Sequence, residues 1–168
     1  MKIILAVDGS PFSDAAVSEM ARRPWPAGSV VRVLYAVEPF GYITPEAGMV
    51  AQSYFEEIEE AAREIVRRAV STLEREAGAR LKVEQVIRNG FPKQAILDEA
   101  KEWGADLIVL GSQGRGWAGR FLLGSVSQAV AAHAGCPVEI VRRPGANEGE
   151  VTASAELGHR GSASEARF

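Results

Sequence analysis

The sequence is poor in cysteine and histidine, with one cysteine, Cys136, and two histidines in 168 residues. One cysteine excludes an internal disulfide, and the chain has no CxxC pair or His/Cys cluster of the kind that holds zinc. Neither sign of charge dominates, because 19 Lys and Arg stand against 22 Asp and Glu. The basic surface that nucleic-acid-binding proteins use is therefore not expected. We expect no nucleic acid partner, and a reducing compartment, the cytoplasm.

Long apolar runs are also missing. The N-terminal run at residues 3–7 ends at Asp8 and is too short for a signal peptide or a membrane span, so no membrane association is expected. With 46% hydrophobic and 24% charged residues, the composition fits one globular domain, which we place at residues 1–143. Residues 144–168 are rich in Gly, Ala, Ser and Glu, and this composition predicts a disordered C-terminal tail.

The chain does have a regular alternation of strand and helix patterns. Strands are predicted at residues 2–7, 30–37, 81–88, 106–110 and 137–141, and helices at 11–23, 47–77, 92–103 and 125–133. This alternation favours an α/β fold with a parallel sheet, helices on both faces and right-handed crossovers. Polar residues in 81–88 indicate an edge strand, and the Pro and Gly content of 38–48 predicts a long mobile loop.

The most informative stretch is GSQGRGWAGRFLLGSVS at residues 111–127. It follows a wholly apolar strand and places glycines at the spacing G-x2-G-x9-G-S, just before a predicted helix. Glycines permit positive φ and let a ligand approach the backbone, while a helix N-terminus offers unpaired N–H groups. The stretch predicts a phosphate cradle that uses the backbone N–H groups of 111–114 and 124–126, helped by the hydroxyls of Ser125 and Ser127.

A carboxylate stands at the end of the first predicted strand. Asp8 is followed by Gly9 and by Ser10, which is a good N-cap with Pro11 at the first helical position. If the first and fourth strands are neighbours, Asp8 faces the glycine loop across the point where ligands bind in such sheets. A nucleotide with Mg²⁺ suits this pair, with Asp8 at the ribose or the metal. Asp8 as a local capping group is the alternative interpretation.

Several segments together resemble the universal stress protein family over residues 1–143. They are ILAVDGS at 4–10, Gly90-Phe91-Pro92, ADLIVLGSQG at 105–114, GSVS at 124–127 and CPVEIVR at 136–142. The resemblance implies a five-stranded parallel sheet of order 3-2-1-4-5, Rossmann-like and similar to the adenine nucleotide alpha hydrolases. It also implies ATP binding, because the glycine spacing marks the ATP-binding branch, and a homodimer formed through the fifth strand, Pro137 to Val141.

The resemblance assigns positions to the nucleotide. Those expected to line its site are Ala6, Asp8, Ala36, Leu110, Gly111, Gly114, Gly124, Ser125 and Val126. Ala36 would meet adenine through its backbone, and Ser125 and Val126 would donate to the far phosphates. Arg115 and Arg120 are basic residues that could reach a γ-phosphate. The family resemblance assigns no role to these two positions.

Two classes of function follow. The first is a nucleotide-responsive stress regulator that holds ATP. The second is a slow ATP hydrolase or phosphotransferase with Asp8 orienting water or metal, which the sequence supports less because no other general base or substrate domain is recognisable. Binding of AMP or cyclic AMP at the same backbone groups remains a third possibility.

Overall fold

The structure is a computed structural model that describes residues 1–38, 48–115 and 123–142, with the backbone alone described at 48–55. The predicted tail at 144–168 lies outside these ranges, as does the predicted loop at 38–48 except for its first and last residues. Arg120 also lies outside them.

Five strands form one parallel sheet in the order β3-β2-β1-β4-β5. The strands are β1 (Lys2–Ala6), β2 (Ser29–Val37), β3 (Leu81–Asn89), β4 (Leu107–Gly111) and β5 (Val138–Val141). The predicted order 3-2-1-4-5 is confirmed, and β3 is an edge strand as its polar residues indicated. β4 is buried at every position, in keeping with its wholly apolar sequence.

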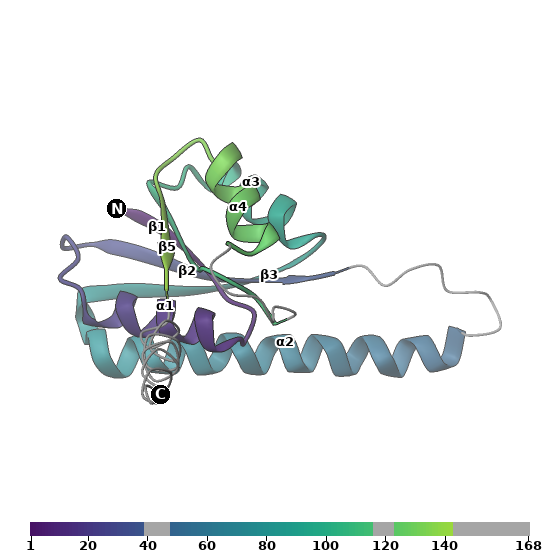
Figure 1. Cartoon of the computed structure of the whole chain (residues 1–168). Helices are drawn as coiled ribbons and strands as arrows, with labels where there is room; N and C mark the ends of the chain where they lie inside the picture. The colour runs from purple at the N-terminus through teal and green to yellow at the C-terminus, as the bar shows by residue number, and fades with distance from the viewer. Residues whose placement is uncertain (39–47, 116–122, 143–168) are drawn as a thin grey trace, which may run out of the picture.

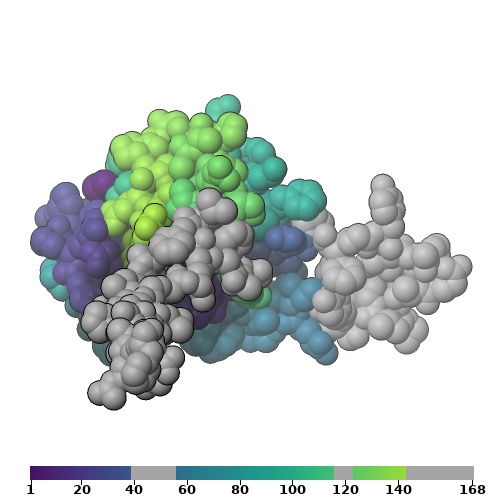
Figure 2. Space-filling model, viewed as in Figure 1, coloured from purple at the N-terminus to yellow at the C-terminus, as the bar shows by residue number. Residues whose placement is uncertain are grey.

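Helices cover both faces of the sheet (Figure 1). α1 (Pro11–Arg22) and α2 (Gly48–Ala77) lie on one face, and α3 (Pro92–Trp103) and α4 (Ser125–His133) lie on the other. A short 3-10 helix, η2 (Gly78–Arg80), follows α2. The space-filling view shows α4 in green and α3 in teal above, and part of α2 in blue below (Figure 2). The sheet is therefore the middle of three layers.

The helix ends follow the local sequence. The Ser10 hydroxyl accepts a hydrogen bond from the Ser13 N–H at 3.2 Å, and Pro11 opens α1. Gly104 ends α3 in the left-handed region with φ 68°, which a residue with a side chain rarely adopts. These features confirm the predicted boundaries.

The long helix α2 has 30 residues, so it is about 45 Å long, and its first part projects past the sheet (Figure 1). Its buried stripe is Ala62, Val66, Ala69, Val70, Leu73 and Ala77. Helical spacing in the sequence predicts that Ala61 and Ala62 both belong to this stripe, and for Ala61 that prediction is wrong, because Ala61 is exposed. In the described residues, no helix is both long and apolar enough to cross a membrane.

Two apolar clusters fill the spaces between the layers. Ile3, Leu5, Val31, Val33 and Val109 point toward α1 and α2, whereas Ile4, Leu34, Ile108 and Leu110 point toward α3 and α4. Successive strand residues alternate between the faces, which accounts for this division. Both faces of the central strands are buried, so a ligand would reach the sheet at the carboxyl ends of the strands.

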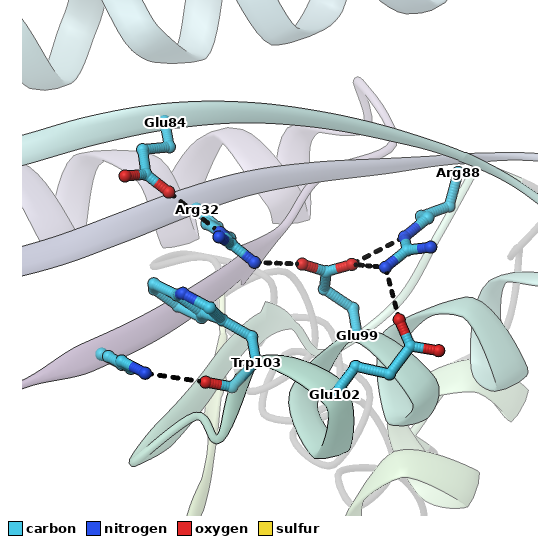
Figure 3. A network of polar contacts seen from close by, with 7 residues as sticks. Arg32, Glu84, Arg88, Glu99, Glu102 and Trp103 are labelled. Carbon is cyan, nitrogen blue, oxygen red and sulfur yellow. Dashed lines mark hydrogen bonds and ion pairs between the residues drawn. The ribbon is translucent and has the colours of Figure 1, made fainter.

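A charged network joins β2, β3 and α3 (Figure 3). The Glu99 carboxylate is 2% exposed and accepts hydrogen bonds from Arg32 Nη1 and Arg88 Nε, both at 2.6 Å. Arg32 also donates to Glu84 at 2.9 Å, and its guanidinium lies 4.1 Å from the centre of the Trp103 ring. Hydrogen bonds from Arg32 and from Lys82 lower the pKa of Glu84. The carboxylate of Glu99 is thus buried with two cationic partners.

Candidate functional site

A cleft of about 880 Å³ opens where β1, β2 and β4 end. Every residue that the resemblance assigned to the nucleotide lines it: Ala6, Asp8, Ala36, Leu110, Gly111, Gly114, Gly124, Ser125 and Val126. The cleft lies at the switch point of the sheet, because α1 leaves β1 toward one face and α4 leaves β4 toward the other. Residues far apart in sequence are therefore brought together at one site.

The edge of β2 supplies backbone groups to the cleft. The Val30 N–H donates to the Met1 carbonyl and the Leu34 carbonyl accepts from the Val7 N–H, so the even-numbered residues of β2 face β1. β1 ends at Ala6, which pairs with Leu34, while β2 continues to Val37. The N–H and C=O of Ala36 consequently point beyond the end of β1 into the cleft. A flat base with a donor and an acceptor on one edge suits these groups.

Asp8 connects the turn after β1 with the loop after β4. One carboxylate oxygen accepts from the Ser10 N–H at 2.9 Å, and the other accepts from the Arg115 N–H at 3.2 Å. The first bond is the local one expected if Asp8 is a capping group. The second joins residues that are 107 positions apart in the sequence. Asp8 is half-buried, so its carboxylate both orders the two loops and faces the cleft.

The N-terminus of α4 faces the same cleft. Its N-cap is Gly124, which has no side chain to accept from the first-turn N–H groups, in contrast to Ser10 on α1. The N–H groups of Ser125, Val126 and Ser127 precede the first intrahelical donor, which is Gln128. The start of α4 therefore presents N–H groups and the positive end of the helix dipole to the cleft.

Three predicted phosphate donors have other partners. The Ser112 N–H donates to the Val141 carbonyl and the Gly124 N–H donates to the Ser112 carbonyl, each at 2.8 Å. The buried Ser127 hydroxyl lies 3.0 Å from the Gly111 carbonyl and 3.1 Å from that of Ser112. These groups hold the loop, β5 and α4 together. The sequence did not reveal these bonds, and phosphate binding by these groups stays a prediction.

The glycines of the motif are required for close packing and not for an unusual backbone conformation. The described glycines with positive φ do not include Gly111, Gly114 or Gly124. A Cβ at Gly111 would lie 2.6 Å from the Phe12 carbonyl carbon, and one at Gly124 would lie 3.2 Å from Gln113 Cα. A Cβ at Gly114 would lie 2.9 Å from an Asp8 carboxylate oxygen. The motif brings backbone against backbone around the cleft.

Sequence reasoning missed part of the cleft wall. The additional lining residues include Tyr35, Glu38, Ile58, Pro92 and Ile96. Tyr35 directly precedes Ala36 at the end of β2, so its place near the site could have been predicted from the sequence. Ile58 lies on α2, whose distance from the strand ends no local pattern reveals. Arg115, singled out for its charge alone, also lines the cleft.

The residues present suit a cation held jointly with phosphate. The described part of the chain contains no cluster of three or more His, Cys, Asp or Glu side chains placed to bind a metal. Asp8 is nevertheless a carboxylate at the cleft, and Mg²⁺ commonly takes one or two carboxylates together with phosphate oxygens and water. Each Asp8 oxygen already accepts one N–H and retains a further lone pair.

Comparison with known proteins agrees with the fold. The family model described as the universal stress protein family matches residues 1–142. The universal stress protein YxiE of Bacillus subtilis is 35% identical over 147 residues, which cover 84% of this chain and 98% of YxiE. The solved universal stress protein UspA from Lactobacillus plantarum has a TM-score of 0.70 at 29% identity, covering 84% of this chain and 97% of that one.

A further solved structure, a universal stress protein in complex with cAMP, has a TM-score of 0.58 and is 25% identical, covering 84% of this chain and 96% of that one. The match of the family model extends over all the described residues and includes every segment that forms the cleft. The chain belongs to the universal stress protein family.

Proposed function

We propose that the protein binds ATP in the cleft and acts in the cytoplasm as a nucleotide-responsive stress regulator. The observation that carries the proposal is the uncapped N-terminus of α4, which opens on the same cleft as the Ala36 backbone edge and Asp8. The α4 N-terminus suits phosphate, the Ala36 backbone suits adenine, and Asp8 suits ribose or a metal ion. A family relative solved in complex with cAMP supports an adenine nucleotide as the ligand.

Mg²⁺ would accompany the phosphates, with Asp8 as its protein ligand. Bound Mg²⁺ would neutralise part of the phosphate charge. Asp8 and Glu38 both line the cleft, and their negative charges oppose a bare polyphosphate. We therefore expect ATP to bind more tightly with Mg²⁺ than with EDTA, and we expect Asp8→Asn to reduce this difference.

Regulation is favoured over catalysis by the chemistry of the cleft. The only described acidic side chains that line it are Asp8 and Glu38, and Asp8 is tied to two backbone N–H groups. Neither histidine is a candidate base among the described residues, since His133 lies at the exposed C-terminal end of α4 and His159 lies outside them. Steady phosphate release that Asp8→Asn abolishes while ATP binding is retained would instead assign a hydrolase.

The direct test of the proposed function is the identity of the ligand. The purified protein is denatured and any released nucleotide is identified, and the refolded or nucleotide-free protein is titrated with ATP, AMP and cyclic AMP in the presence of Mg²⁺. We expect ATP to bind most tightly. Absence of binding by every adenine nucleotide would refute the proposal, and preference for AMP or cyclic AMP would reassign the ligand.

Dimerisation through β5 is the second part of the proposal. The Pro137 carbonyl accepts from Ile108 in β4 and the Val141 carbonyl from Ser112 just after it, so the outward N–H and C=O groups belong to the alternate residues Val138 and Ile140. β5 is an edge of the described sheet, and an antiparallel second copy would pair these groups. Ile140→Pro removes an outward donor, and we expect it to sediment as a monomer while Ile140→Val remains a dimer. A dimeric Ile140→Pro protein would refute this interface.

A further inference from the structure

Arg115 crosses from the loop after β4 to the ends of β1 and β2. Its Nε donates to the main-chain carbonyl of Asp8, and its Nη2 donates to the Tyr35 hydroxyl at 2.9 Å. The guanidinium carbon lies 5.5 Å from the centre of the Tyr35 ring. Arg115 is exposed and lines the cleft, as does Tyr35. The side chain is thus held at the site by two hydrogen bonds and one ring contact.

The charge of Arg115 is the feature that these contacts leave uncompensated. Among the described residues its two side-chain acceptors, a peptide carbonyl and a phenol, are both neutral, and the Asp8 carboxylate accepts from the Arg115 backbone N–H instead. Neither side-chain bond engages Nη1. Among the described residues that line the cleft, Arg115 is the only Lys or Arg. The planar, positively charged guanidinium of Arg115 could donate hydrogen bonds to a phosphate in the cleft.

We infer that Arg115 is the cation that recognises the phosphate chain of the nucleotide, and that Tyr35 is the positioning residue that holds its guanidinium at the cleft. This inference rests on the proposed function and adds a specificity element to it. The backbone donors of α4 act on any anion at the helix start, whereas a guanidinium adds affinity only for ligands whose phosphates reach it. Arg115 therefore distinguishes nucleotides by their phosphates and leaves recognition of the base to the β2 edge.

The test compares ligands that differ only in phosphate number. Adenosine, AMP, ADP and ATP are titrated into the wild type, Arg115→Gln and Arg115→Lys. Loss of one exposed charge-assisted interaction is expected to weaken ATP and ADP binding about tenfold in Arg115→Gln. Adenosine affinity is expected to stay within about twofold of wild type, since a nucleoside gives the guanidinium no anionic partner. Arg115→Lys should recover part of the loss, because it keeps the charge without the planar fork.

Salt dependence gives a second measurement that a structural defect would not change. A direct ion pair makes the dissociation constant for ATP rise with ionic strength, so its slope should be shallower in Arg115→Gln than in the wild type. Arg75→Gln is the matched control, because Arg75 is 68% exposed on α2 and does not line the cleft. It removes the same charge, and we expect wild-type affinities and slope.

The outcomes separate this inference from the proposed function. Equal loss of affinity for all four ligands in Arg115→Gln, or an unchanged ATP affinity and salt slope, would overturn the role of Arg115 while adenine nucleotide binding stands. Failure of the wild type to bind any of the four would refute the proposed function itself.

Tyr35→Phe tests the positioning role. It keeps the ring beneath the guanidinium and removes the hydroxyl that accepts from Nη2. We expect ATP and ADP affinities to fall about threefold, less than in Arg115→Gln, with adenosine unchanged, because the guanidinium keeps its charge and loses one hydrogen bond that positions it. A loss shared by adenosine would place Tyr35 at the base instead, and no change for any ligand would show that the hydroxyl positions nothing.

Discussion

Substituting Gly111 by Ala separates packing from ligand binding within the glycine motif. The added Cβ would lie 2.6 Å from the Phe12 carbonyl carbon, 2.7 Å from its oxygen and 2.8 Å from the Ser13 nitrogen. The shortest of these is about 1 Å less than the optimal separation of non-bonded atoms. All three are backbone atoms of the first turn of α1, so no side-chain rotation relieves the contact.

The magnitude follows from the cost of overpacking a rigid contact. Inserting a methyl group into a well-packed region costs about 1–3 kcal/mol, and we expect the upper half of this range at Gly111 because a whole helix turn must move. Gly114→Ala provides the comparison. Among the described residues its Cβ would meet only the carboxylate oxygen of Asp8, at 2.9 Å, which is the end of a half-buried side chain. We expect a cost below about 1 kcal/mol there, together with weaker nucleotide binding.

Urea unfolding measures both variants. With slopes of about 1–3 kcal/mol/M, a loss of about 2–3 kcal/mol lowers the midpoint by about 0.7–3 M, which circular dichroism resolves easily. Titration of the folded variants with ATP then reports the binding term. If Gly111→Ala unfolds at the wild-type urea concentration and still fails to bind ATP, the glycine serves the ligand directly and the packing argument is wrong.

Three further predictions concern groups outside the cleft. Glu99→Gln should lower the free energy of unfolding by about 2 kcal/mol, because it removes the buried charge that Arg32 and Arg88 share and leaves them only the more exposed Glu84 and Glu102 as anionic partners. Urea unfolding should show less than about 1 kcal/mol for the half-exposed Glu84→Gln. Hydrogen bonds from Arg32 and Lys82 lower the pKa of Glu84 from 4.5, so the stability that the ionised Glu84 adds to the fold is complete above about pH 5 and is lost as the pH falls through the lowered value. The difference in free energy of unfolding between wild type and Glu84→Gln should therefore vanish in acid. A difference that is the same at every pH contradicts this. Burial, with a smaller effect of the Asp106 charge, raises the pKa of the Cys136 thiol. Iodoacetamide at pH 8 should therefore alkylate this thiol several-fold more slowly in the native protein than in urea. Equal rates would show that the thiol is accessible.

The fold could be predicted because local and long-range signals agree. Apolar strands, Pro11 at the start of a helix and Gly104 at the end of one set the element boundaries without reference to the rest of the chain. The strand order came from the family resemblance, and the structure confirms it. The error at Ala61 arose because helical spacing defines a stripe only to within about one residue, and the packing of α2 on the sheet decides which side is buried.

The residues assigned to the site could be expected to lie together, whereas their hydrogen bonds could not be predicted. All nine assigned residues line one cleft, since strand ends converge wherever the sheet order is right. Which N–H groups remain available depends on partners across the fold, and Ser112, Gly124 and Ser127 turned out to bond to one another or to β5. The contact of Arg115 with Tyr35 depends in the same way on a pairing over 80 residues of sequence, which no local pattern encodes.

The bonding of Ser112 also bears on the order of events during synthesis. Its N–H binds the carbonyl of Val141 in the last strand, while its carbonyl accepts from Gly124 and Ser127 at the start of α4. A nascent chain that has reached only α4 therefore lacks the partner that fixes this loop, although Asp8 and the first strands are long since made. The loop beside the cleft can form this bond only after Val141 has left the ribosome, so the proposed nucleotide binding would follow synthesis of the last strand.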